Sequence, residues 1–263
     1  MIRTKLFLLG LVLSFVLAPV RAAAPRPVAP QDPAALTGIV AYVYDGDTIR
    51  VRLDSGGEKK VRLIGVDSPE FDDTRESARL QAFLARRFVH SRLDQKPVRL
   101  TMDKEKEDAY GRLLAYVWTD GPEMFNLVLV REGFARAYLK FPFDGTVKKR
   151  IEEAEAEAKR EERGLWAVKP PPVIGPAEAG SRLGKVVTVR FRCVRTFERA
   201  RFRVLVPSEG NFEAVVPVDV LAALPGSLDF ENKDMEVTGL VEMYKGRPQI
   251  VIGVPVQVKV IPV

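Results

Sequence analysis

Cysteine is almost absent from this sequence of 263 residues, which contains Cys193 and no other thiol. A single thiol cannot form a disulfide within the chain, so we expect packing alone to hold the fold together. Cys193 occurs in the alternating stretch VVTVRFRCV, on the same face as Val187 and Val189. This position predicts a buried and chemically inert thiol rather than a reactive one.

Histidine is equally rare, since the chain contains His90 alone. Catalysis by a pair of histidines and metal sites built from several histidines are therefore excluded. His90 stands late in a predicted amphipathic helix among polar and basic neighbours, so we expect a surface position without a catalytic role. The chemistry left to this chain rests on carboxylate, hydroxyl and guanidinium groups.

Long hydrophobic runs are also missing, apart from LFLLGLVLSFVL near the N-terminus. This run is shorter than the roughly 20 residues that a membrane-spanning helix needs. It follows Arg3 and Lys5 and precedes the small residues of APVRAAAP, which predicts a signal peptide at residues 1–22. The alternative is an uncleaved membrane anchor. After cleavage we expect an exported protein, periplasmic or extracellular, without stable membrane insertion.

The chain has no strong excess of either charge. Charged residues make up 29% and hydrophobic residues 46%, as in an ordinary globular protein. The formal net charge is +6, but the signal peptide carries three basic residues and no acidic one, which leaves +3 for the mature chain. A charge this small is weak evidence for a nucleic-acid partner.

Proline is concentrated in two stretches, APRPVAPQDPAAL and VKPPPVIGPAEAGS. Prolines at this density exclude a continuing helix or a central strand. They predict a proline-rich lead-in at 23–37, a first domain at 38–168, a proline-rich linker at 169–181 and a second domain at 182–263.

Both predicted domains are rich in short strands. The first has strand patterns at about 38–44, 47–54, 58–66, 97–102 and 111–118, and helical patterns in TRESARLQAFLARRFVHSRL, GPEMFNLVLVREGFA and GTVKKRIEEAEAEAKREERGLW. The second alternates strongly, and only VDVLAAL is helical in pattern. The predicted fold class is mainly β with helices (α+β): two five-stranded OB-fold barrels, the first with three helices.

Two aspartates interrupt an otherwise strand-like stretch, AYVYDGDTIRVRL. Carboxylates are rare in strands and costly to bury without a partner. If the strands at 47–54 and 58–66 pair through DSGG, Asp47 lies near Asp67 across the sheet. Two carboxylates held together repel unless a cation lies between them, and an all-oxygen site suits Ca²⁺ or Mg²⁺. Asp45 is expected to shape the turn.

Two arginines and a glutamate accompany these aspartates in the first domain. Arg62 and Arg112 can hold a phosphate in bidentate fashion and stabilise charge that develops on it. Glu70 lies beyond the expected metal ligands and is available as a base toward water. Together these are the groups that phosphodiester hydrolysis needs. Taken singly, each residue has the alternative of an ordinary turn or surface ion pair.

The segments YDGDTIRV, RLIGVDSPE and YGRLLAYVW resemble the three signature segments of the staphylococcal-nuclease-like (thermonuclease) family, over about residues 38–168. The resemblance implies a Ca²⁺-dependent endonuclease that hydrolyses DNA and RNA. Water attacks phosphorus and the 5′-oxygen leaves. The expected substrate is preferentially single-stranded nucleic acid, and the expected state is a monomer.

The same resemblance implies a role for each matching residue. Asp47 and Asp67 match metal ligands, and Ser68 matches the residue that contributes its backbone carbonyl to the metal. Arg62 and Arg112 match phosphate-binding residues, and Glu70 matches the general base. The alternative function is a catalytically silent module that retains the nuclease fold and binds nucleic acid or protein.

Aromatic residues in RAYLKFPF fall where the family contacts the nucleotide base. Tyr138, Phe141 and Phe143 are candidates for this contact. Packing within the domain is the alternative role for these side chains.

The second domain contains MEVTGLVEMYKGRPQIVI, which resembles a strand pair of OB domains that bind nucleic acid or accompany nucleases. Four arginines, Arg190, Arg192, Arg201 and Arg203, alternate with aromatic residues in VRFRCVR and RARFRV. If the two strands form a hairpin through TFER, the four line one outer face and suit a phosphate backbone. The alternatives are a charged face that aids solubility and a domain that docks a partner.

Overall fold

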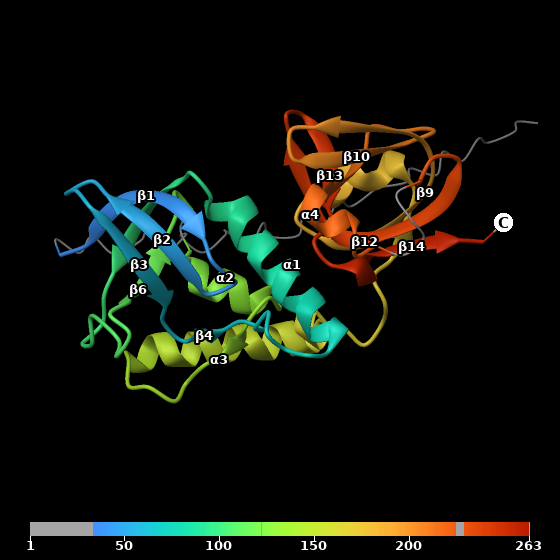
Figure 1. The fold of residues 1–263 in the computed structure, drawn as a ribbon. Coiled ribbons are helices and arrows are strands. Elements are labelled where there is room, and N and C mark those ends of the chain that lie inside the picture. The colour runs from blue at the N-terminus through green and yellow to red at the C-terminus, as the bar shows by residue number, and fades with distance from the viewer. Residues whose placement is uncertain (1–33, 122, 225–228, 263) are drawn as a thin grey trace, which may run out of the picture.

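The computed structural model describes residues 34–121, 123–224 and 229–262. The predicted signal peptide and most of the predicted lead-in lie outside these residues. Two β-barrels lie next to each other, and the helix α1 (Glu76–Leu93) runs between them (Figure 1). None of the described helices is long and apolar enough to cross a membrane.

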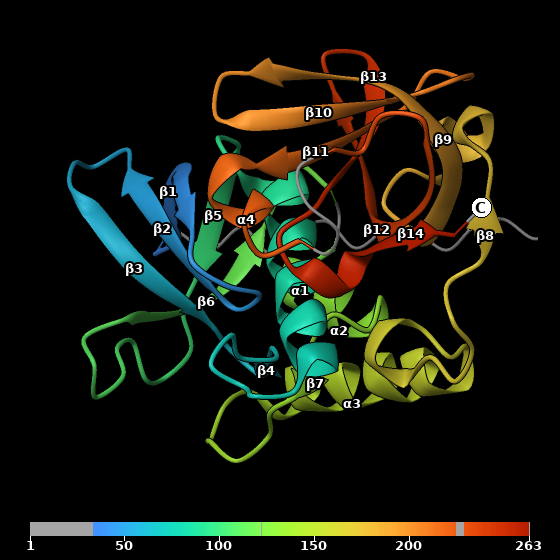
Figure 2. The ribbon, with the colours of Figure 1, turned by 45° about the vertical axis from the view of Figure 1, so that its right-hand side comes forward.

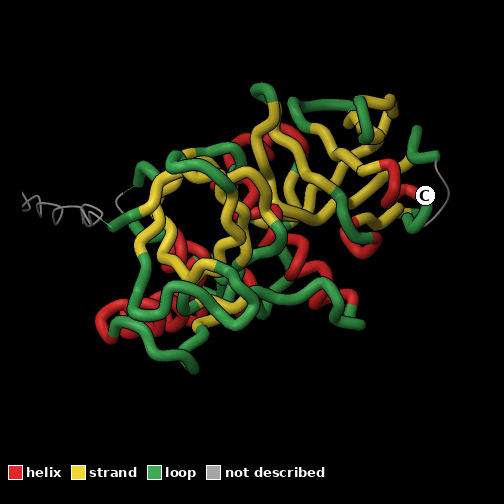
Figure 3. Tube along the Cα trace, turned by 60° about the vertical axis from the view of Figure 1, so that its left-hand side comes forward, coloured by secondary structure: helices red, strands yellow, loops and turns green. Residues whose placement is uncertain are grey.

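The first barrel closes in the order β1, β2, β3, β6, β5, and its ring of strands is visible in Figure 3. Its strands are β1 (Leu36–Val43), β2 (Thr48–Leu53), β3 (Glu58–Leu63), β5 (Pro97–Thr101) and β6 (Leu113–Trp118). β3 and β6 pair in parallel and the other neighbours are antiparallel. Alternation within the strands directs Ile49, Val51 and Val61 into the core.

Three helices cover this barrel, as predicted: α1, α2 (Phe125–Arg131) and α3 (Gly145–Arg160). On α1, Phe88 is fully buried and its ring stacks on that of Phe134 at 4.2 Å between centroids. A short 3-10 helix, η1 (Gly164–Trp166), follows α3. The helices therefore share one hydrophobic core with the barrel.

The predicted third strand was too long. β3 ends at Leu63, because the chain turns at Gly65, whose φ of +77° favours glycine. The next two residues form β4 (Val66–Asp67), which pairs with β7 (Arg136–Ala137) instead of continuing along the barrel. Asp67 therefore lies outside the barrel strand that was predicted to run to residue 66.

A buried asparagine fixes this turn to its surroundings. Asn126 on α2 is completely buried. Its side-chain amide donates to the carbonyl of Ile64 at 2.9 Å, and its Oδ1 accepts from the backbone N–H of Val117 at 2.9 Å. One side chain thus joins α2, β6 and the end of β3.

The second barrel closes in the order β9, β10, β11, β13, β12, because β12 pairs with β9 as well as with β13. Its strands are β9 (Val186–Arg199), β10 (Phe202–Pro207), β11 (Glu213–Pro217), β12 (Lys233–Tyr244) and β13 (Arg247–Val251), with β8 (Val173–Ile174) and β14 (Val258–Ile261) added at the edges. The remaining elements are the helix α4 (Val218–Leu221) and two 3-10 helices, η2 (Pro176–Arg182) and η3 (Pro255–Gln257). Two five-stranded barrels, the first with three helices, confirm the predicted fold class.

The stretch expected to be a linker contains regular structure. β8 and most of η2 lie within residues 169–181, and Ile174 and Ala179 are buried in the second core. The prolines permit this because β8 is a short edge strand that pairs on one side only. The second barrel thus uses residues before 182, and the domain boundaries stay predictions.

The helix α1 packs against the outer face of the second barrel (Figure 2). Phe83 joins a small cluster with Val204, Val215 and Val251 of strands β10, β11 and β13. Next to this cluster, Arg87 Nε donates to Glu242 Oε1 on β12 at 2.8 Å. Only 7% of the Glu242 side chain is exposed. The two barrels are therefore joined by an apolar contact and a buried ion pair.

Cys193 and His90 fit their expected environments. Cys193 is fully buried, and burial raises the pKa of its thiol, which confirms the predicted inert position. His90 is partly exposed on α1 and lies 3.4 Å from Asp94.

Candidate active site

The turn between β1 and β2 carries the two aspartates. β1 ends at Val43 and β2 begins at Thr48, whose carbonyl accepts from the backbone N–H of Tyr44 at 3.0 Å. The Oδ1 of Asp45 accepts from the backbone N–H of Asp47 at 2.9 Å. This side-chain turn confirms that Asp45 shapes the interruption of the strand.

Gly46 brings the turn against its neighbours. A Cβ atom at this position would lie 2.6 Å from the Cβ of Ser68 and 2.8 Å from the Cβ of Ala85 on α1. Because glycine allows this approach, the buried Asp47 reaches the segment after β4. Its Oδ2 accepts from the backbone N–H of Ser68 at 2.8 Å.

Arg62 lies between the two predicted metal-binding aspartates. Its Nη1 is 3.2 Å from Asp47 Oδ1, and its Nη2 is 3.5 Å from Asp67 Oδ1. Nη1 also donates to the carbonyls of Leu63 and Val66 at 3.1 and 2.7 Å. The structure thus brings both carboxylates to one guanidinium, through the turn at Gly65 rather than through a continuous strand.

Arg112 is held by an aspartate that sequence reasoning missed. Asp108 accepts from the Nε of Arg112 at 2.7 Å and from its backbone N–H at 2.9 Å. Asp108 also accepts from the backbone N–H of Tyr110. The sequence signal was available, because an aspartate before a glycine turn commonly bonds to backbone N–H groups a few residues ahead.

One cleft of about 610 Å³ is lined by some of these groups, whereas Asp47, Ser68 and Glu70 are not among its lining residues. Arg62, Asp67 and Arg112 line it together with Tyr138 and Phe141. The two aromatic residues reach the cleft because β7 pairs with β4, and the backbone N–H of Tyr138 donates to the carbonyl of Gly65 at 2.9 Å.

Tyr110 also lines the cleft and was not predicted as a site residue. Its side chain is 85% exposed, and the Arg112 guanidinium lies 5.5 Å from its ring centroid. An exposed aromatic ring beside a phosphate-binding candidate offers a surface on which a base can stack.

Glu70 lies in the exposed loop after β4. Partial burial raises the pKa of its carboxyl, and the charges of Asp47, Asp45 and Asp67 raise it further. Burial and the charge of Asp47 raise the pKa of Asp67 as well. The carboxylates therefore form one region of excess negative charge around Arg62.

The donor atoms in this region fit a hard divalent cation in type. Asp47, Asp67 and the backbone carbonyl of Ser68 supply oxygen only, the ligand class of Ca²⁺. The Ser68 Oγ is buried and makes no hydrogen bond within the described part of the chain. Among residues 34–121, 123–224 and 229–262, no group of three or more His, Cys, Asp or Glu side chains has the geometry of a metal site. A Ca²⁺ site made of two carboxylate side chains, one backbone carbonyl and water molecules has fewer than three such side chains, so it agrees with that observation.

Comparison with known proteins identifies the family. The model described as Staphylococcal nuclease homologue matches residues 60–168. The thermonucleases of Staphylococcus intermedius and Staphylococcus hyicus are each 41% identical over 128 residues, which is 49% of this chain and 74% of theirs. The chain belongs to the staphylococcal nuclease family. Endonuclease YhcR of Bacillus subtilis is 30% identical over 164 residues, or 60% of this chain and 14% of that protein.

The staphylococcal nuclease match begins within β3 and includes β4, all three helices of the first barrel and the cleft residues Arg62, Asp67 and Arg112. It ends at residue 168, before the second barrel. The site of this family member is therefore built by the first barrel and the segments that follow its strands.

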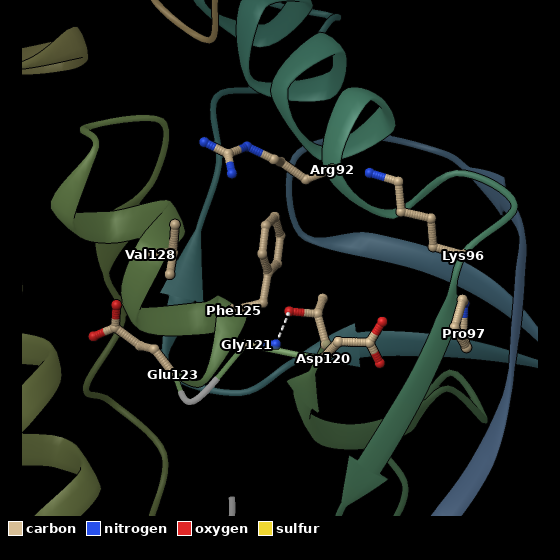
Figure 4. A pocket seen from close by; sticks show the side chains of 9 residues that line it. Arg92, Lys96, Pro97, Asp120, Gly121, Glu123, Phe125 and Val128 are labelled. Carbon is tan, nitrogen blue, oxygen red and sulfur yellow. Dashed lines mark hydrogen bonds between the residues drawn. The ribbon is translucent and has the colours of Figure 1, made fainter. Parts of the chain in front are cut away.

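A second hollow, of about 430 Å³, shares no residue with the cleft. Figure 4 shows the ring of Phe125 projecting into it between Arg92 and Asp120. Lys96 and Glu123 also line it, so the charges are mixed in sign. It contains none of the predicted site residues, and we assign it no role in the activity of the family.

The first two arginines predicted to form a strip on the second barrel pair with acids. Arg190 bonds to Glu236 on β12 through its Nε at 2.9 Å. Arg192 lies 3.4 Å from Asp234 on the same strand. These contacts follow the register of β9 and β12, which places each arginine opposite its acid.

The other two arginines lie elsewhere, because the hairpin turns later than predicted. The turn falls at Ala200, with φ of +53°, and Arg201, rather than within 196–199. Arg203 pairs with Glu198, and Phe202 is exposed. The structure does not bring the four arginines into one strip.

Proposed function

We propose that this protein is an exported, Ca²⁺-dependent nuclease that hydrolyses phosphodiester bonds of DNA and RNA, preferentially single-stranded. The observation that carries the proposal is the convergence of Arg62, Arg112 and Asp67 in one cleft beside exposed aromatic rings. Membership of the staphylococcal nuclease family and the similarity to a thermonuclease and an endonuclease support it. Export rests on the signal-like N-terminus.

The two arginines bind the phosphate. Asp108 engages the Nε of Arg112, which leaves its two amino groups for phosphate oxygens. Arg62 contributes Nη2, which lies 3.5 Å from Asp67 Oδ1. Both guanidiniums stabilise the negative charge that grows on the phosphate oxygens during hydrolysis.

Glu70 accepts the proton of the attacking water. Partial burial and the neighbouring carboxylates raise the pKa of its carboxyl, which strengthens Glu70 as a base. Asp47, Asp67 and the carbonyl of Ser68 would hold Ca²⁺, which would supply positive charge toward the phosphate and polarise the attacking water. The 5′-oxygen leaves, and the product carries a 3′-phosphate.

Digestion of single-stranded DNA by residues 23–263 tests this function. We expect cleavage with Ca²⁺ and loss of cleavage with a chelator. Glu70→Gln should lower kcat by roughly 100-fold or more, as expected for the loss of a general base. Tight DNA binding without cleavage in the presence of Ca²⁺ would establish the silent binding module instead, and undiminished cleavage by Glu70→Gln would remove the assigned base.

A further inference from the structure

Aromatic and basic side chains gather on the outer face of the first barrel. They come from the end of β1, from β2 and β3, which are neighbours in Figure 1, and from α1. We call this group the tyrosine platform, and it consists of Tyr42, Tyr44, Arg50, Lys60 and Arg86.

The two tyrosine rings form the centre of the platform. Their centroids are 4.9 Å apart, with an angle of 74° between the ring planes. The guanidinium of Arg50 lies 5.5 Å from the Tyr42 centroid and 5.8 Å from that of Tyr44. Tyr42 remains 40% exposed. A solvent-accessible ring is therefore held in place by its neighbour and a cation.

Two further cations complete the platform. Lys60 Nζ lies 4.5 Å from the Tyr44 centroid. Arg86 lies 5.7 Å from the Tyr42 centroid, and its Nη2 donates to the Tyr42 hydroxyl at 3.1 Å. The hydrogen bonds of Arg86 go to this hydroxyl and to the Val43 carbonyl, so they leave its charge uncompensated.

The platform carries excess positive charge. Within the described part of the chain, Glu58 is the one carboxylate at ion-pair distance from the three cations, 3.4 Å from Arg50. Surface aromatic–cation contacts alone need no ligand, and they also occur elsewhere in this protein. The platform differs because three cations converge on two adjacent rings with a single acid.

Strand register connects the platform to the active site. On β3, Lys60 and Arg62 point to the same face, two residues or roughly 7 Å apart. Arg50 lies opposite Lys60 on β2, and Tyr42 lies opposite Arg50 on β1. Lys60 of the platform is therefore the neighbour of Arg62 on the same face of β3, and we assigned the Arg62 guanidinium to the cleaved phosphate.

We propose that the tyrosine platform is a binding subsite for single-stranded nucleic acid next to the cleaved bond. Bases stack on Tyr42 and Tyr44, and Arg50, Lys60 and Arg86 bind the neighbouring phosphates. This arrangement favours single strands, whose bases are unpaired, and tolerates any sequence, since every base has a stacking face. The inference rests on the proposed function and extends the same site.

Binding in the Glu70→Gln background tests the platform without cleavage. The probe is a fluorescein-labelled 12-mer of thymidylate, measured by anisotropy with Ca²⁺ at physiological salt. Tyr42→Ala with Tyr44→Ala should weaken binding about tenfold or more, because stacking on both rings is lost. Tyr42→Phe with Tyr44→Phe keeps the rings and should restore most of the affinity, which a folding defect of the alanine variant would not explain.

Tyr244→Ala is the matched control. Tyr244 is also 40% exposed and has two cations near its ring, Arg199 at 5.0 Å and Lys245 at 5.4 Å, but it lies on the second barrel. We expect the affinity of the Tyr244→Ala variant for the 12-mer to differ less than twofold from that of its parent. Equal weakening in this control, or alanine variants of the platform that bind within twofold of their parent, would overturn the proposal.

Cleavage of substrates of two lengths distinguishes a failure of the platform from a failure of the proposed function. With Glu70 restored, the platform alanine variant should lose about tenfold in kcat/KM on the 12-mer, and the loss should shrink on a diester of a single nucleotide. An equal loss on both substrates contradicts the platform. If the proposed function itself fails, the unmodified protein cleaves neither substrate, while the anisotropy experiment still decides whether the platform binds.

Discussion

At the residue scale, the arginines of the cleft depend on acceptors that fix their orientation. Asp108 bonds to both the side chain and the backbone of Arg112, and the carbonyls of Leu63 and Val66 fix Arg62. A guanidinium held in one orientation loses less conformational freedom when it binds a phosphate. Orientation by these acceptors is therefore part of how the site works.

Asp108→Asn should lower kcat/KM for single-stranded DNA by roughly tenfold, because hydrogen bonds to a charged partner contribute about 1.5–3 kcal/mol. Steady-state kinetics with Ca²⁺ measure the effect. Glu107→Gln is the control, since Glu107 lines the same cleft but forms an exposed ion pair with Lys59. A loss in the control as large as in Asp108→Asn would point to cleft charge rather than to the orientation of Arg112.

At the element scale, the end of β3 is the part of the fold on which the site depends most. Gly65 turns the chain out of the barrel, and the pairing of β4 with β7 then brings Asp67 and Tyr138 into the cleft. Asn126 holds the carbonyl of Ile64 at the start of this turn. One buried amide therefore supports both the barrel and the site.

Asn126→Ala should lower the free energy of unfolding of the first barrel by about 2–4 kcal/mol, because it leaves buried backbone groups of Ile64 and Val117 unpaired. Both tryptophans, Trp118 and Trp166, belong to this part of the chain, so their fluorescence in urea follows its unfolding. The exposed Asn211→Ala serves as the control and should change the midpoint little. An unchanged midpoint in Asn126→Ala would show that water replaces the amide.

At the scale of the whole molecule, α1 serves both barrels. Its Leu84 and Phe88 are buried in the first core, whereas Phe83 and Arg87 contact the second barrel. The valine cluster that receives Phe83 covers part of the outer face of β10, β11 and β13. That part of the second barrel docks on the nuclease domain of the same chain.

Glu242→Ala should lower the urea midpoint reported by the two tryptophans, although Glu242 lies on the second barrel. The substitution leaves the partly buried Arg87 without its partner. Removing one member of a buried ion pair typically costs about 3–5 kcal/mol. Arg87→Met with Glu242→Leu should recover much of the loss. Glu236→Ala, whose ion pair with Arg190 lies within the second barrel, should leave this midpoint unchanged. The same midpoint in all variants would mean that the barrels unfold independently.

The sequence by itself determined the fold class and the kinds of chemical groups at the site. Strand alternation and helical spacing are local properties, so two barrels and three helices followed from them. The scarcity of cysteine and histidine left carboxylates and guanidiniums as the reactive groups, and YDGDT, RLIGVDSPE and YGRLLAYVW showed where they stand.

Only the tertiary structure decided how those groups meet. Asp67 reaches Arg62 through a turn at Gly65 that strand periodicity does not predict. Tyr138 enters the cleft because β4 pairs with β7, which is distant in the sequence. The hairpin of the second barrel turns at Ala200 and Arg201, later than predicted, and the four arginines do not form one strip. Register and long-range pairing depend on which surfaces the whole chain buries together, and no local pattern contains that information.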